Sequence, residues 1–148
     1  MKTILLILIF AFTVSAQSVE KTVEKIRAVY DETSQKAKAA EEDEEMGNIG
    51  DLVVNELAVN SRNHQWRAVG IYQPTYKFFY KVTGESMYPE TLVMVKTAKR
   101  ISSRNYYEEY LYNEQGTLLF YFKKAENDDM APAERRVYFN LGKAVRIV

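Results

Sequence analysis

The chain has 148 residues, the length of one ordinary domain, and its 20 basic and 20 acidic side chains give a formal net charge of zero. Because phosphate binding needs a surplus of basic residues, this balance argues against nucleic acid as a partner. The chain has no cysteine, which excludes disulfides, thiol nucleophiles and cysteine-based metal sites.

Residues 1–16 have the pattern of an export signal that is removed by cleavage. Lys2 supplies a positive charge, residues 4–12 form an uninterrupted apolar run, and small residues lead up to Ala16, after which a signal peptidase would cut. The run of roughly nine residues is well short of the ~20 that a membrane-spanning helix needs, and a retained N-terminal anchor is the alternative interpretation. We expect a mature domain over residues 17–148 that is periplasmic or secreted and has no stable membrane span.

The next segment, residues 18 to about 40, is predicted to be an amphipathic helix. Its apolar and small residues recur at alternating steps of four and three, which places them on one face: Val19, Val23, Ile26, Tyr30, Thr33 and Ala37. Ser18 can cap the first turn. One face of the helix therefore packs on a larger layer, and the following sheet is the candidate for that layer.

Residues 41–50 combine a run of acidic side chains with Gly47 and Gly50. Carboxylates at a helix C-terminus oppose the helix dipole, so we expect the helix to fray near Ala40 and this stretch to form a solvated linker. A calcium site or a site for a cationic partner is the alternative, but consecutive acids lack the spaced ligands of a calcium loop.

From residue 51 onward the pattern changes to that of β-strands separated by turns. The predicted strands cover residues 52–60, 75–82, 91–101, 106–112, 117–123, 134–139 and 143–148. Residues 113–116 and 140–142 carry Asn and Gly in the order typical of hairpin turns, and residues 126–132 are predicted to be a polar loop. The sequence thus predicts an α+β domain, with an N-terminal helix packed on an antiparallel β-meander of about six or seven strands over residues 51–148.

No residue pattern identifies a catalytic site or a metal site. His64, the single histidine, lies in a polar stretch between strands, where a surface position is the simplest interpretation. Glu108 and Glu109 are neighbours in a predicted strand, so their side chains point to opposite faces and cannot act on one substrate together. A hydrolase of envelope polymers that uses carboxylates from separate strands, together with His64, stays open as the alternative function. We predict no cofactor.

Aromatic residues are the main compositional excess, and nearly all of them lie in the predicted sheet region. Tyrosine joins a large apolar ring to a polar hydroxyl, which suits a half-exposed binding surface, although core packing and strand propensity also favour rings here. We predict that a ligand or partner binds at these rings: Trp66, Tyr76, Tyr80, Tyr106, Tyr110 and Tyr112. The expected function is that of an exported, non-catalytic protein that binds another macromolecule or an envelope ligand through an aromatic sheet face or an open sheet edge.

Residues 106–122, which contain the first predicted hairpin, resemble a stretch of small exported proteins from Bacteroidetes-type bacteria. The order of the segments is also similar: a signal peptide, a helix like residues 26–30, and a meander that ends near residues 134–139. The resemblance covers most of the mature chain. It implies the same compartment and fold class, and it brings no activity with it.

Overall fold

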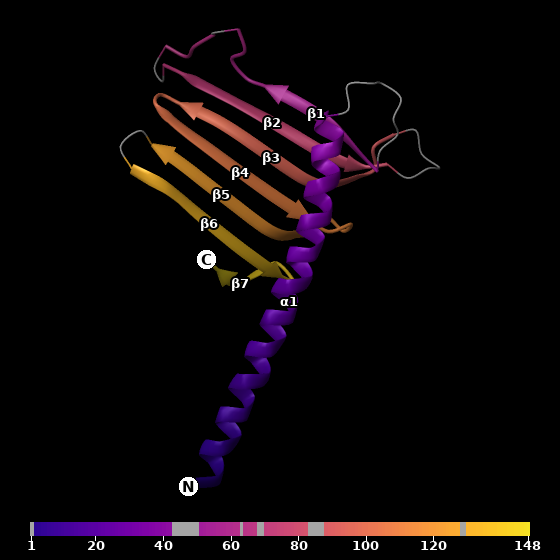
Figure 1. The fold of residues 1–148 in the computed structure, drawn as a ribbon, viewed down its shortest axis with the longest axis vertical. Helices are drawn as coiled ribbons and strands as arrows, with labels where there is room; N and C mark the ends of the chain where they lie inside the picture. The colour runs from indigo at the N-terminus through magenta and orange to yellow at the C-terminus, as the bar shows by residue number, and fades with distance from the viewer. Residues whose placement is uncertain (1, 43–50, 63, 68–69, 83–87, 128–129) are drawn as a thin grey trace.

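One long helix crosses one face of a seven-stranded antiparallel sheet (Figure 1). The computed structural model describes residues 2–42, 51–62, 64–67, 70–82, 88–127 and 130–148. The elements are α1 (Lys2–Glu42), β1 (Leu52–Ala58), β2 (Tyr72–Lys81), β3 (Thr91–Ile101), β4 (Arg104–Tyr112), β5 (Leu118–Asn127), β6 (Met130–Asn140) and β7 (Lys143–Ile147). Each strand pairs with the next one in the chain, so the order in the sheet is the order in the sequence. The predicted α+β meander is confirmed.

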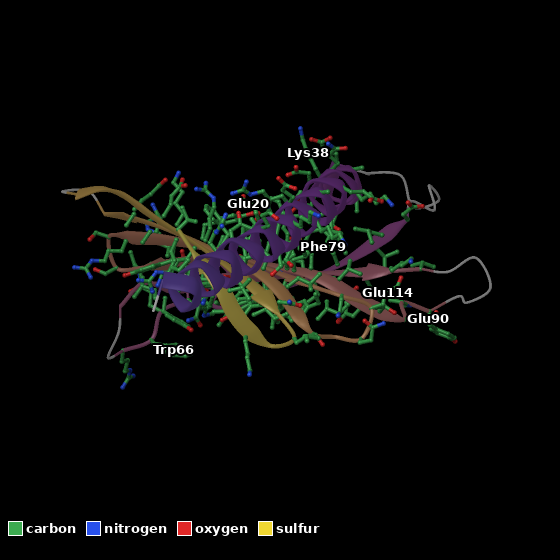
Figure 2. All side chains as sticks on the ribbon, turned by 90° about the horizontal axis from the view of Figure 1, so that it is seen from below. Glu20, Lys38, Trp66, Phe79, Glu90 and Glu114 are labelled. Atoms are coloured by element: carbon green, nitrogen blue, oxygen red, sulfur yellow. The ribbon has the colours of Figure 1, made fainter. Side chains whose placement is uncertain are left out.

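The predicted apolar stripe of α1 is the face that meets the sheet. Val23, Ile26 and Ala37 are buried, and Val19 and Tyr30 pack against the same cluster. The sheet contributes buried side chains from neighbouring strands: Leu52, Phe79, Met94, Leu111, Phe120 and Tyr138. Figure 2 shows Phe79 where the helix crosses the sheet. Apolar burial contributes about 25 cal/mol per Å², so this contact stabilises the docking of α1 on the sheet.

The C-terminal end of α1 is fixed to the sheet by ion pairs. Glu41 accepts hydrogen bonds from Lys77 of β2 and Lys96 of β3, each with a donor–acceptor distance of 3.0 Å. Burial disfavours the charged form of Glu41, but the hydrogen bonds from the two lysines outweigh burial and lower its pKa. The helix continues to Glu42, two residues beyond the predicted end near Ala40. Residues 43–50 of the predicted linker lie outside the described residues.

The N-terminal end of α1 extends further than the predicted start at residue 18. The helix begins at Lys2, and its first turns project past the sheet (Figure 1). Contacts of the described side chains begin near Val19 and Glu20, where Glu20 pairs with Arg146 of β7 at 2.6 Å. Within the described residues, no helix has both the length and the apolar content that a bilayer crossing requires.

Both predicted hairpin turns are confirmed. The side-chain oxygen of Asn113 accepts a hydrogen bond from the backbone N–H of Thr117 (2.8 Å), and Gly116 has a φ of 75°. In the second turn, Leu141 and Gly142 have φ values of 48° and 74°. Two successive left-handed residues match the twist of the flanking strands, which is why tight hairpins use them.

The predicted polar loop over residues 126–132 is wrong. β5 continues to Asn127, β6 begins at Met130, and these two residues are paired across the hairpin. The register shifts between Ala125 and Asn127, which leaves Pro132 in an irregular part of β6. Proline has no N–H to give to a strand ladder and is tolerated at such irregularities. Its presence hides this strand from a reading of the sequence pattern.

Candidate functional site

The sheet has one face that α1 covers and one that it does not. Phe79, Met94 and Leu111 are cross-strand neighbours that pack in the core under α1. Because side chains alternate along a strand, the residues next to these three point the opposite way. We call this second side the open face, since none of the described helices or strands lies over it (Figure 1, Figure 2).

Most of the predicted binding rings lie together on the open face. Tyr76 and Tyr80 of β2, and Tyr106 and Tyr110 of β4, alternate with residues that face the helix, and all four are half-buried. Tyr110 contacts the ring of its cross-strand partner Tyr121 of β5, with 5.0 Å between centroids. The face therefore carries aromatic rings from several strands, two of which are in contact.

Trp66 reaches this surface through a neighbouring ring. It lies in the connection between β1 and β2, where it forms an isolated bridge with Gly70. Its indole stacks on the ring of Tyr72 at a centroid distance of 4.6 Å, and Tyr72 shares the open face with Tyr76. Trp66 is 50% exposed and lies at the periphery in Figure 2. It extends the aromatic surface at one end of β2.

Tyr112 lies at the end of β4, where the pairing with β5 shifts register between Leu111 and Tyr112. The extra residue is Leu119 of β5, so the bulge interrupts the alternation of side chains along β5 and not along β4. Tyr112 lines a recess of about 440 Å³ together with Val29 and Lys36 of α1. Tyr112 thus borders this recess, whereas none of the other predicted rings does.

Glu108 connects the hydroxyl groups of the open face. Its Oε2 accepts hydrogen bonds from Lys99 Nζ (2.8 Å) and Tyr110 OH (3.2 Å). Its Oε1 accepts one from Tyr121 OH (3.1 Å), and the Thr97 hydroxyl donates a hydrogen bond to Oε2 (3.3 Å). A buried carboxylate with this many donors is well compensated. The two phenols are consequently held in fixed orientations.

The charges in this network are set by burial and by the contact between Glu108 and Lys99. Burial would raise the pKa of Glu108, but the hydrogen bond and charge of Lys99 outweigh burial and lower it. Burial, followed by the charge of Glu108, raises the pKa of Tyr110 to about 12. At neutral pH the site is therefore an ion pair surrounded by uncharged phenols.

Basic side chains lie over the rings of the open face. Lys99 Nζ is 6.0 Å from the ring centroid of Tyr76, and Lys123 Nζ is 5.7 Å from that of Tyr106. Cations at this distance are attracted to the ring face. Lys123 is also the cross-strand partner of exposed Arg135. Two basic residues are therefore cross-strand neighbours on the open face of β5 and β6.

Glu109 lies on the other side of the sheet from Glu108, as predicted. It accepts hydrogen bonds from Tyr30 of α1 and Tyr107 of β4. Burial, followed by the hydrogen bond to Glu109, raises the pKa of both tyrosines. Glu109 therefore ties the helix to the sheet, and the two neighbouring acids cannot share a substrate.

The contacts of the acidic residues bear on the alternative of a hydrolase. Two carboxylates that act together must face the same bond of a substrate. Every side-chain partner of Glu108 is a hydrogen-bond donor, while Glu134 pairs with Arg136 at 2.7 Å on the helix side. His64 is exposed in the β1–β2 connection. The described residues include no group of three or more acidic or histidine side chains that could hold a metal ion.

Sequence analysis did not identify the residues that organise the open face around Glu108. Thr97 lies opposite Glu108 across β3 and β4, and Tyr121 lies opposite Tyr110 across β4 and β5. These pairings depend on the strand register, which the sequence pattern does not define. The only available signal was the alternation along β3, which puts Lys99 two residues from Thr97 on the same side.

Compared with known proteins, the chain matches no family model, no curated protein and no solved structure.

Proposed function

We propose that the protein is an exported, non-catalytic binding protein whose open face contacts a macromolecular partner. The observation that carries this proposal is a sheet face with half-buried rings that no described element of the chain covers. Contiguous apolar surface larger than a few hundred Å² on a soluble protein marks an interaction site. Rings with hydroxyl groups suit such a site because they are apolar on one side and polar at the tip.

The shape of the open face favours a macromolecule over a small molecule. Small ligands bind in concave sites that enclose most of their surface. The recesses of about 600, 440 and 170 Å³ are lined mainly by helix-side residues, and the open face contributes only Lys99 and Tyr106 to the first. The central rings Tyr76, Tyr110 and Tyr121 line none of these three recesses.

The size of the open face also suits a protein partner. Five strands, β2 to β6, spaced about 4.8 Å apart and paired over about eight residues each, cover roughly 600 Å² in projection. Interfaces of standard size bury about 800 Å² on each partner. One partner of ordinary size would therefore cover the face, with the tyrosines near its centre where binding energy concentrates.

Export of the protein is part of this proposal. Residues 1–16 carry the signal pattern. The resemblance of residues 106–122 to small exported proteins of Bacteroidetes-type bacteria supports the same location. We expect intact-mass analysis of the protein from a periplasmic or culture fraction to give a chain that begins at Gln17. A chain that retains Met1 in that fraction would contradict this part of the proposal.

Site-specific photocrosslinking tests the proposed surface. A photoreactive phenylalanine analogue replaces Tyr80 or Tyr106 on the open face, and Lys25 on the exposed side of α1 serves as the matched control. We expect a discrete adduct from the two open-face positions in the producing cell and none from Lys25. The adduct's partner is identified by mass spectrometry, purified, and shown to bind the protein in solution.

The affinity for that purified partner then tests the role of the rings. Truncating a central aromatic residue of an interface typically costs 2 kcal/mol or more. Tyr110→Ala and Tyr121→Ala are therefore each expected to weaken binding by roughly thirty-fold. Adducts from Lys25 alone, or unchanged affinity in both tyrosine variants, would overturn the proposed function.

A further inference from the structure

Strands β5 and β6 carry two pairs of basic residues whose side chains point to opposite faces of the sheet. On the helix side, Lys124 pairs with Glu126 at 2.6 Å and Arg136 pairs with Glu134 at 2.7 Å. On the open face, their sequence neighbours Lys123 and Arg135 form no ion pair with any carboxylate of the described residues. Among the described residues, one pair of cations is complemented by carboxylates and the other pair is not.

In the part of the chain that the structure describes, the open face has no spare acid to compensate these charges. Along the described parts of β2 to β6, Glu108 is the only acidic residue that alternation places on this face. Its oxygens already accept hydrogen bonds from Lys99, Thr97 and two phenols. Lys123 is the cross-strand partner of Glu108, yet its ammonium lies over the Tyr106 ring. The positive charge of Lys123 and Arg135 is therefore available to an external group.

This charge pattern argues against a second copy of the chain as the occupant. A symmetric interface brings the same surface patch from both partners together. Two open faces would bring together four uncompensated cations and two carboxylates that are already paired. Like charges placed together at an interface cost several kcal/mol. A different, negatively charged partner fits the face better.

The residues around the two cations indicate what else the partner carries. Interfaces between proteins are enriched in tyrosine, tryptophan, phenylalanine and arginine. Tyr110 and Tyr121 lie one cross-strand row from Lys123 and Arg135 on the open face. A purely charged polymer would leave these apolar groups in water, whereas a polypeptide can offer carboxylates and apolar side chains together.

We propose that the open face binds an acidic segment of another protein. Its carboxylates pair with Lys123 and Arg135, and its apolar side chains cover Tyr110 and Tyr121. This inference rests on the proposed function and adds the chemistry of the partner to it. Opposite charges across an interface mainly accelerate encounter and exclude wrong partners, and their effect decreases as salt rises.

A dye-labelled random copolymer of glutamate and tyrosine is the probe, and fluorescence anisotropy measures its binding to the purified protein at low and at physiological salt. The test variant is K123Q/R135Q, and the matched control K124Q/R136Q makes the same changes at adjacent positions on the helix side. Exposed ion pairs and surface charges without a carboxylate partner contribute little to folding, so both variants are expected to keep the circular dichroism spectrum and urea midpoint of the parent.

We expect the parent to bind the copolymer more weakly as salt rises. K123Q/R135Q should reduce the affinity at low salt by about ten-fold, and K124Q/R136Q by no more than about two-fold. The single variants K123Q and R135Q should each show an intermediate loss. A copolymer of lysine and tyrosine, and polygalacturonate, which is acidic but has no ring or aliphatic side chains, should both bind much more weakly.

Several results would overturn the inference. They are an absence of copolymer binding at low salt, equal losses in both double variants, and equal binding of the lysine copolymer. Binding of polygalacturonate as tight as that of the glutamate copolymer would point to an acidic glycan instead. Concentration-dependent dimers that Tyr110→Ala abolishes would point to a second copy. If Tyr80 and Tyr106 crosslink to a partner that K123Q/R135Q binds as tightly as the parent does, the acidic-segment inference is wrong. The proposed function would still hold in that case.

Discussion

The two faces of the sheet carry similar side chains but differ in what completes them. On the helix side, Phe79 and Leu111 are covered by α1, and Glu109 accepts hydrogen bonds from tyrosines of both the helix and the sheet. On the open face, rings of the same kind surround Glu108, which is satisfied within the sheet itself.

The residues of the helix side serve folding, and those of the open face are available for binding. Side chains on the helix side find their partners inside the molecule and stabilise the fold. On the open face, only the central carboxylate is fully compensated, and the rings and two cations around it remain accessible. The open face is thus held in a defined conformation before any partner arrives, which reduces the conformational entropy lost on binding.

The largest expected effect contrasts two neighbouring phenylalanines. Phe79 is fully buried under α1, whereas Phe78 is half-buried on the open face. Because truncation of a buried ring removes its burial and leaves a cavity, Phe79→Ala should lower the free energy of unfolding by about 4 kcal/mol and Phe78→Ala by about 1–2 kcal/mol. Urea denaturation followed by circular dichroism measures both. Equal losses would mean that both faces are equally covered.

A smaller loss is expected at the carboxylate that joins α1 to the sheet. Glu109 is 6% exposed and accepts from both Tyr30 and Tyr107. In Glu109→Gln one acceptor oxygen becomes a donor, so one phenol proton loses its acceptor and unfolding should become easier by about 2 kcal/mol. Tyr30→Phe in the same background should cost less than it does in the parent, because the two changes remove one network.

The open face should reveal itself by its response to acid. The pKa of Glu108 is lowered from its ordinary value of 4.5, so the native state favours the carboxylate. Its stabilisation is present above pH 4.5 and is lost as the pH falls through the lower, native pKa. The difference in unfolding free energy between the parent and Glu108→Gln, about 1 kcal/mol at pH 7, should therefore shrink in acid. A difference that does not change with pH would show that Lys99 does not control this group.

The smallest effect is expected at a surface pair on the helix side. Lys81 and Glu114 lie 2.9 Å apart, but their side chains are 47% and 67% exposed. Water screens such pairs, so Glu114→Gln should change the free energy of unfolding by less than about 0.5 kcal/mol. A larger loss of unfolding free energy in urea denaturation would show that exposed ion pairs also stabilise the helix side of the sheet. Burial alone would then not explain the difference between the two faces.

More of the fold than of the candidate site could be predicted from the sequence. The stripe with Val23, Ile26 and Ala37 predicts the buried face of α1 because helical spacing alone brings these residues together. Alternation along a single strand likewise predicts that Glu108 and Glu109 separate. Both inferences use only the local geometry of one element.

The features that could not be predicted depend on how strands pair. The meeting of Glu108 with Tyr121 requires the register of β4 with β5, and that register shifts between Leu111 and Tyr112. Pro132 argues against a strand in the sequence pattern, but the register shift in the pairing of β5 with β6 accommodates it. Periodicity along one strand contains no information about its offset from the next.

The agreement between strand order and chain order has a consequence for how the molecule folds. Every pair of neighbouring strands is consecutive in the sequence, so each strand can be added to an edge that already exists. The docking of α1 is different, since Arg27 meets Tyr138 across 111 residues of chain. Local contacts form faster than distant ones. The meander is therefore expected to assemble early, and the last kinetic step is closure of the first element onto a nearly finished sheet.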